Sequence, residues 1–111
     1  MKPDSIIAGL SALAQEHRLA LFRLLVQAGE DGMAAGRIAK ALGLPNSSLS
    51  FHLGQLQSAG LIEQERQGRS LIYRAAFSTM NALIAYLTEN CCGGAPCDWL
   101  PAAKVQERAS A

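Results

Sequence analysis

The sequence predicts a single, mainly α-helical domain with one small β-hairpin. Apolar residues recur at helical spacing through most of residues 5–90, whereas residues 61–74 contain two short strand-like runs around a glycine. The 111 residues are one domain's worth, and a hydrophobic share of 50% excludes general disorder. No apolar stretch approaches the roughly 18 residues that span a membrane, so we expect no membrane partner.

Five helices are expected, and turn-forming residues separate them. Gly29, Gly43 and Gly60 directly follow the second, third and fourth helical patterns, which is a common position for the residue that ends a helix. Asn46 is the expected N-cap of the fourth helix. The predicted helices span residues 5–14, 16–28, 34–42, 47–59 and 78–90.

Two strands are expected at residues 61–66 and 70–74, joined by a turn with Gly68 at its centre. Two short helices connected by a glycine-containing turn and followed by a hairpin are typical of a winged helix-turn-helix domain. In that fold the fourth helix would be the recognition helix and the hairpin the wing.

The predicted helix 47–59 has one apolar side and one uncharged polar side. At about 100° per residue, Leu49, Leu53 and Leu56 fall together, with His52 on their flank. The opposite face carries no charge, although a solvent-facing helix usually carries Glu and Lys. Carboxylates would be repelled by phosphates, whereas Ser and Gln can bond to base edges and Phe can touch a thymine methyl group. This composition favours a helix that reads the major groove over an ordinary polar surface.

The charge distribution agrees with a DNA-binding middle segment. Residues 32–88 carry a net charge of +3, while the segments on either side each carry −1. Arg69 lies at the predicted hairpin tip, where it could reach a phosphate or a minor groove; the alternative is a solubilising charge on an exposed wing. The residues expected to contact DNA are Asn46, Ser47, Ser48, Ser50, Phe51, His52, Gln55, Arg66, Arg69 and Arg74.

Several segments together resemble the ArsR/SmtB family. They are the run at 17–25, the segment 38–44, the Ser-x-His-Leu helix at 47–56, the Ala-Gly-Leu-Ile exit at 59–62 and the Gly-Arg wing at 66–74. The resemblance covers roughly residues 5–90. It implies a homodimeric winged-helix repressor that leaves its operator when it binds a toxic metal or metalloid. Gly54 departs from the family, which often has a basic residue there, so a phosphate contact is in doubt.

The first and last predicted helices have broad apolar faces that one small core cannot cover together. Excess apolar surface of this kind marks an interface. A two-fold homodimer through these helices would present two recognition helices to successive major grooves of a partly palindromic operator. The residues that form the faces are Ile6, Ile7, Leu10 and Leu13 in the first helix and Met80, Leu83, Ile84 and Leu87 in the last.

The candidate sensor is a cluster of three thiols, Cys91, Cys92 and Cys97. The Cys-x-Cys pair of the family's familiar arsenic site is absent from residues 33–37, and the Asp and His ligands of its zinc site are absent from residues 77–90. Thiolates select soft ions. Trivalent arsenic or antimony is satisfied by three sulfurs, which favours arsenic(III), including methylated forms, or antimony(III) as the inducer. Zinc needs a fourth ligand, which Asp98 could supply, so a soft divalent metal and a redox response both stay open.

The remaining features exclude an enzyme and suggest the compartment. The sequence has no glycine-rich phosphate loop and no Ser-His-Asp set, and the cysteines lack a partnered base. Three clustered cysteines favour a reducing cytoplasm over a secreted disulfide framework. We therefore expect a cytoplasmic DNA-binding repressor with no required cofactor, and the alternative is a protein-binding winged helix. Its domain and thiol cluster would occupy residues 1–97, and residues 98–111 would form a flexible tail.

Overall fold

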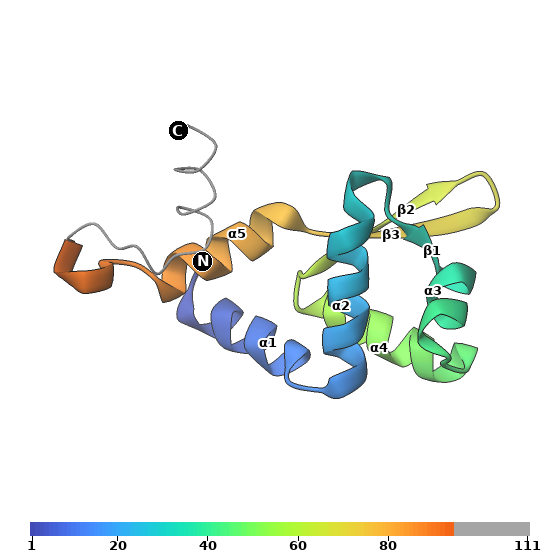
Figure 1. Ribbon diagram of the computed structural model, residues 1–111, viewed down its shortest axis with the longest axis horizontal. Coiled ribbons are helices and arrows are strands. Elements are labelled where there is room, and N and C mark those ends of the chain that lie inside the picture. The colour runs from blue at the N-terminus through green and yellow to red at the C-terminus, as the bar shows by residue number, and fades with distance from the viewer. Residues whose placement is uncertain (95–111) are drawn as a thin grey trace, which may run out of the picture.

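The computed structural model describes residues 1–94 and is a winged helix-turn-helix fold, which confirms the predicted fold class (Figure 1). Five helices and a three-stranded antiparallel sheet make up the domain. Within the described residues, no helix is both long enough and apolar enough to cross a membrane. In chain order the elements are α1 (Pro3–Leu13), α2 (Glu16–Ala28), the 3₁₀ turn η1 (Gly29–Asp31), β1 (Met33–Ala34), α3 (Ala35–Leu42), α4 (Asn46–Ser58), β2 (Ile62–Gln67), β3 (Ser70–Ala75), α5 (Phe77–Leu87) and the 3₁₀ turn η2 (Cys91–Gly94).

The core is built around α2, which runs through the middle of the molecule with α1 and α5 on one side and α3 and the hairpin on the other (Figure 1). Leu21 and Leu25 of α2 are completely buried. The apolar side of α4 packs against the same core, as the helical spacing predicts. The side chains buried there are Ile38 of α3, Leu49, Leu53 and Leu56 of α4, and Leu61 just before β2.

The sheet has the strand order β1-β3-β2, and its first strand was not expected from the sequence. Met33 and Ala34 pair with Tyr73 and Ile72 of β3, which ties the start of α3 to the wing. Gly32 makes this approach possible. It has φ +67°, and a Cβ at this position would lie 2.5 Å from the carbonyl oxygen of Tyr73.

Apart from both ends of α2 and the last residue of α3, the predicted helix ends differ from the observed ones by one to three residues. Asn46 is not an N-cap; it is the first residue of α4, and Pro45 precedes it in an extended conformation with no side-chain cap. The fixed φ of Pro45 suits the last residue before a helix, and its carbonyl accepts the N–H of Leu49 at 3.0 Å. The last helix ends at Leu87 rather than at residue 90, and Asn90 then takes a left-handed conformation with φ +56°.

The helices α1 and α5 pack against each other and leave an apolar surface uncovered. Ile6 and Leu83 are buried, and Leu83 lies close to Gly9 because that residue has no side chain. Leu83 therefore belongs to the core and not to the outer surface. Of the side chains predicted to form the two apolar faces, those that remain exposed are Ile7 (61%), Leu10 (41%), Ile84 (48%) and Leu87 (55%).

Candidate nucleic-acid interface

The outer face of α4 is the uncharged surface that the sequence predicts. No Asp, Glu, Lys or Arg occurs in the helix, and its buried residues all lie on the opposite side. Phe51 is 59% exposed, an unusual position for a large aromatic ring. Five polar residues of this helix that are predicted to meet DNA have exposed or half-buried side chains. They are Asn46, Ser47, Ser48, Ser50 and Gln55.

His52 does not lie on this face but on the inner flank of α4, and its contact with DNA stays a prediction. Its side chain is only 8% exposed, and Nδ1 lies 3.4 Å from Nη1 of Arg18. Its ring is 5.6 Å from the ring of His17, centroid to centroid. Burial lowers the pKa of His52, and the positive charge of Arg18 and the nearby His17 lower that pKa further.

The wing presents two arginines to solvent. Arg66 lies on β2 and Arg69 lies in the turn between β2 and β3, and both are exposed. Within residues 1–94, neither side chain makes a hydrogen bond or ion pair. Both guanidinium groups are therefore available to a partner with negative charge.

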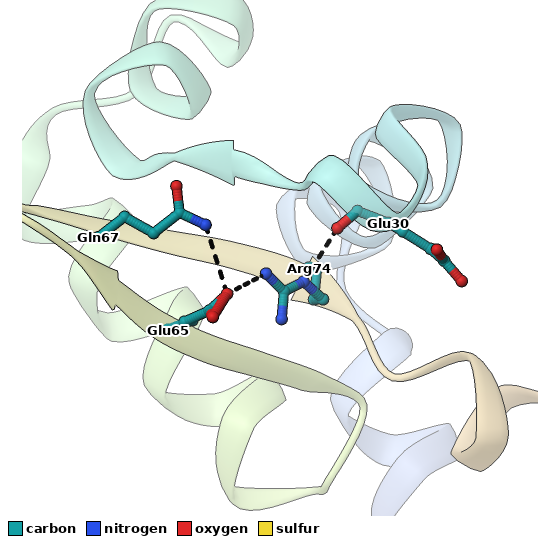
Figure 2. Close-up of polar contacts among 4 residues, drawn as sticks. All are labelled: Glu30, Glu65, Gln67 and Arg74. Carbon is teal, nitrogen blue, oxygen red and sulfur yellow. Dashed lines mark hydrogen bonds and ion pairs between the residues drawn. The ribbon is translucent and has the colours of Figure 1, made fainter.

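Arg74 is engaged within the protein, and its contact with DNA stays a prediction. Figure 2 shows its guanidinium between Glu65 of β2 and the backbone of Glu30 in η1. Arg74 forms an ion pair with Glu65, its Nε donates to the Glu30 carbonyl oxygen at 3.1 Å, and Gln67 also donates to Glu65 at 3.4 Å. The bond from Arg74 lowers the pKa of Glu65, as does the weaker one from Gln67, and it raises the pKa of Arg74. These contacts tie the wing to the end of α2.

Known proteins resemble this one in both sequence and fold. The helix-turn-helix domain family matches residues 13–65. The HTH-type transcriptional regulator YgaV of Escherichia coli (strain K12) is 32% identical over 89 residues, which are 80% of this chain and 88% of that protein. The solution structure of Mb0332 from Mycobacterium bovis, a homodimeric winged helix-turn-helix DNA-binding domain described as a possible ArsR-family regulator, is 32% identical with a TM-score of 0.63. The match covers 78% of this chain and 81% of Mb0332.

The chain belongs to the ArsR/SmtB family. An ArsR-like transcriptional regulator from Rhodococcus sp. RHA1 has the same fold, with a TM-score of 0.68 at 24% identity over 96% of this chain and 88% of that one. This ArsR/SmtB-family protein is a DNA-binding transcriptional regulator and not an enzyme, as the sequence predicts.

The thiol cluster of this ArsR/SmtB-family protein begins at Cys91, with three residues between it and the end of α5. Cys91 and Cys92 lie in η2, and their Sγ atoms are 3.5 Å apart. Cys92 has a left-handed backbone (φ +56°, ψ +33°), which turns the chain sharply. Cys97 lies outside the described residues, as do Asp98 and the predicted tail 98–111. Among residues 1–94, no three His, Cys, Asp or Glu side chains gather at one point that could hold a metal.

Sequence reasoning missed three contacts that shape the interface: Arg18 with His52, Arg74 with Glu65, and Arg74 with the Glu30 backbone. The strand pairing of the predicted hairpin could have indicated the contact between Arg74 and Glu65. In the β2–β3 register Glu63 faces Arg74, which places Glu65 diagonally across from Arg74 on the same face of the hairpin. The other two contacts join segments far apart in the sequence, and no spacing rule predicts them.

The ion pair of the wing gives a pH prediction. Because hydrogen bonds lower the pKa of Glu65 below its ordinary 4.5, its ionised form strengthens the wing above that pH. The contribution is lost as the pH falls through the lowered pKa. In a carbon-13 NMR titration, the Glu65 carboxyl should have a midpoint below 4.5, and Arg74→Gln should raise that midpoint toward 4.5.

The matched control is Arg66→Gln, which removes an exposed arginine of the same hairpin that makes no contact with Glu65. Its Glu65 midpoint should equal that of the parent protein. A midpoint that Arg74→Gln leaves unchanged would contradict the assigned ion pair.

Proposed function

We propose that this protein is a cytoplasmic repressor that binds operator DNA as a homodimer. Trivalent arsenic or antimony, bound by Cys91, Cys92 and Cys97, would release it from the operator. The observation that carries the sensor proposal is the position of two neighbouring thiols shortly after α5, turned together by a left-handed backbone. The family relationship supports the DNA-binding part.

The separation of the two sulfurs suits a shared ion. With sulfur–ion bonds of about 2.3 Å, as for zinc, two thiolates on one ion lie roughly 3.3–3.8 Å apart. The Sγ atoms of Cys91 and Cys92 are 3.5 Å apart. A disulfide between them is disfavoured, since neighbouring Cα atoms are about 3.8 Å apart and disulfides usually need about 4.4–6.8 Å. Cys97, five residues after Cys92, would supply the third sulfur.

The proposed dimer uses the exposed apolar faces of α1 and α5. These faces carry Ile7, Leu10, Ile84 and Leu87, which are all at least 41% exposed in the single chain. The M. bovis relative is described as homodimeric, which supports the same state here. Since the thiols follow α5 closely, an ion bound there would act on the end of an interface helix. It would lower operator affinity only as far as it binds the DNA-free arrangement more tightly.

The proposed DNA-contacting surface consists of the outer face of α4 and the two solvent-facing arginines of the wing. The α4 groups can bond to base edges or touch a thymine methyl group, and the arginines can neutralise phosphates. The residues of this surface are Asn46, Ser47, Ser48, Ser50, Phe51, Gln55, Arg66 and Arg69.

Two substitutions separate the reading of bases from the binding of phosphates. Arg69→Ala should weaken binding to all DNA sequences alike and reduce the salt slope by about one unit. Gln55→Ala should instead reduce the preference for the selected sequence by roughly 10- to 100-fold if it bonds a base edge. Fluorescence anisotropy on a duplex selected by the parent protein from a random pool, and on a scrambled duplex, measures both effects.

The control for these variants is Arg23→Ala, which removes an exposed arginine of α2 outside the proposed surface. If Arg69→Ala and Gln55→Ala both behave like this control, α4 and the wing are not the reading surface. Absence of any salt-dependent DNA binding by the parent protein would favour a protein-binding winged helix instead.

The dimer is tested with a charge on the exposed face of α5. Leu87→Glu should place a carboxylate in the proposed interface and yield monomers that keep the helical content of the parent protein, because Leu87 is 55% exposed within the chain. Sedimentation equilibrium measures the mass. Leu19→Glu is the matched control, since Leu19 is 46% exposed on α2 and should leave the dimer intact. A dimeric Leu87→Glu variant would place the interface elsewhere.

The sensor is tested by removing the thiols. Each of Cys91→Ser, Cys92→Ser and Cys97→Ser should abolish release of the selected duplex by sodium arsenite and leave DNA binding itself unchanged. The chain has only three cysteines, so the triple variant has no thiol left to bind arsenic. A triple variant that still releases the duplex with arsenite would overturn the proposal.

The same titration distinguishes the alternatives that the sequence left open. Release by zinc, cadmium or lead but not by arsenite would indicate a divalent-metal site. Release by an oxidant, reversed by a dithiol reductant and without response to either ion, would indicate a redox sensor. Dependence on only two of the three cysteines would indicate a two-thiol site suited to methylated arsenicals.

A further inference from the structure

One side chain links three helices at the base of the domain. Arg18, near the start of α2, donates from Nε to the carbonyl oxygen of Ala12 in α1 at 2.7 Å. Its Nη1 lies 3.4 Å from Nδ1 of His52 in α4. Its own backbone N–H donates to the Gln15 side chain at 2.9 Å, which fixes the start of α2. The guanidinium therefore spans the last turn of α1 and the inner flank of α4.

A solvent-open hollow lies beside this link. It has a volume of about 350 Å³ and lies where α1, α2 and α4 meet, and Arg18 forms part of its wall together with Ala8, Ser11 and Ser58. Within residues 1–94, no other side-chain hydrogen bond leads from α1 toward α4. Gln55, on the proposed DNA-reading face, also lines this hollow. Arg18 is therefore the side chain that connects α1 and α4 by directional polar contacts within residues 1–94.

We propose that Arg18 and His52 are positioning residues for DNA binding, which set the orientation of α4 relative to α1 only while the imidazole of His52 is neutral. The inference rests on the proposed function, because DNA binding by a dimer through α1 and α5 is its readout. In such a dimer, the angle between α1 and α4 decides whether two recognition helices fit successive major grooves.

The donor chemistry of the pair requires neutral His52. Arginine has only donors, so Nδ1 must act as the acceptor and any ring proton must be on Nε2. The groups around His52 offer its cation no support: Arg18 and His17 face it from α2, Phe51 lies 5.7 Å away on α4 itself, and α1 contributes the Ala12 carbonyl that Arg18 already uses. No carboxylate of residues 1–94 is bonded to the ring.

Protonation would therefore break the link as the pH falls. Burial already lowers the pKa of His52 below its ordinary 6.5, so the ring is neutral near pH 7.5 and takes up its proton only below 6.5. In that range the unfolded chain binds the proton more readily than the folded chain, so stability also decreases as the pH falls. Added positive charge alone has the opposite effect on DNA binding, because it attracts phosphates.

The experiment compares specific and non-specific DNA binding at two pH values. Anisotropy titrations with the duplex selected from a random pool and with a scrambled duplex are run at pH 7.5 and 5.5. For the parent protein, the Kd for the selected duplex should rise by roughly tenfold at pH 5.5, while the Kd for the scrambled duplex stays constant or falls. At pH 7.5, Arg18→Lys should weaken selected-duplex binding by roughly tenfold, since an ammonium cannot span both acceptors in a fixed fork.

The two histidines of the chain provide matched variants. His52→Asn keeps an acceptor near the position of Nδ1 and cannot titrate, so it should bind the selected duplex equally well at both pH values. His17→Gln should keep the pH response of the parent protein. Circular dichroism and sedimentation at both pH values verify that each variant is a folded dimer.

The outcomes separate this inference from the proposed function. If the parent protein selects no duplex from the pool, both fail. If it selects one but the loss at pH 5.5 persists in His52→Asn, or if a folded Arg18→Lys binds like the parent protein, the positioning role is overturned. If Arg18→Lys does not fold, the comparison of the parent protein with His52→Asn and His17→Gln still tests the positioning role.

Discussion

The burial of Leu21 and Leu25 of α2 is the contact on which the other elements depend. These two side chains are completely buried against Ile38 of α3, Leu56 of α4 and Leu61 at the entry to the hairpin. Because one helix supplies the surface on which the others pack, the angles between α3, α4 and the wing are set by the same few apolar contacts. Loss of a buried leucine in such a core typically removes about 2–5 kcal/mol of stability, a large share of the total for a domain of this size.

Outside the core, the two ends of the molecule carry surfaces of different chemistry. At one end α4 and the hairpin present uncharged polar groups, one exposed aromatic ring and two arginines without internal partners. At the other end α1 and α5 present aliphatic side chains and lead into the thiols. The Arg18 side chain lies between the two ends, in contact with α1 and α4 at once.

Much of the fold could be predicted from the sequence, because helix limits and helix faces depend on local residue spacing. The limits of α2 were predicted to the residue, and the wheel of α4 separated its buried side from its exposed side, since helical spacing alone decides both. Strand β1 could not be predicted, because its two residues are too few to show the alternation of buried and exposed side chains that marks a strand. His52 and Arg74 were assigned to DNA because composition reveals charge and polarity but not the internal partners, Arg18 and Glu65, that occupy them.

The exposed edge of the sheet could pair with a strand of another molecule. β2 lies at the edge, and all its residues after Ile62 are exposed. An exposed edge strand is a template on which a second chain could add its own strand. Here Glu63, Glu65 and Arg66 place three charged side chains along that edge, which discourages a neighbouring strand from docking. Charged side chains along an edge strand are one of the ways in which proteins protect such an edge from pairing.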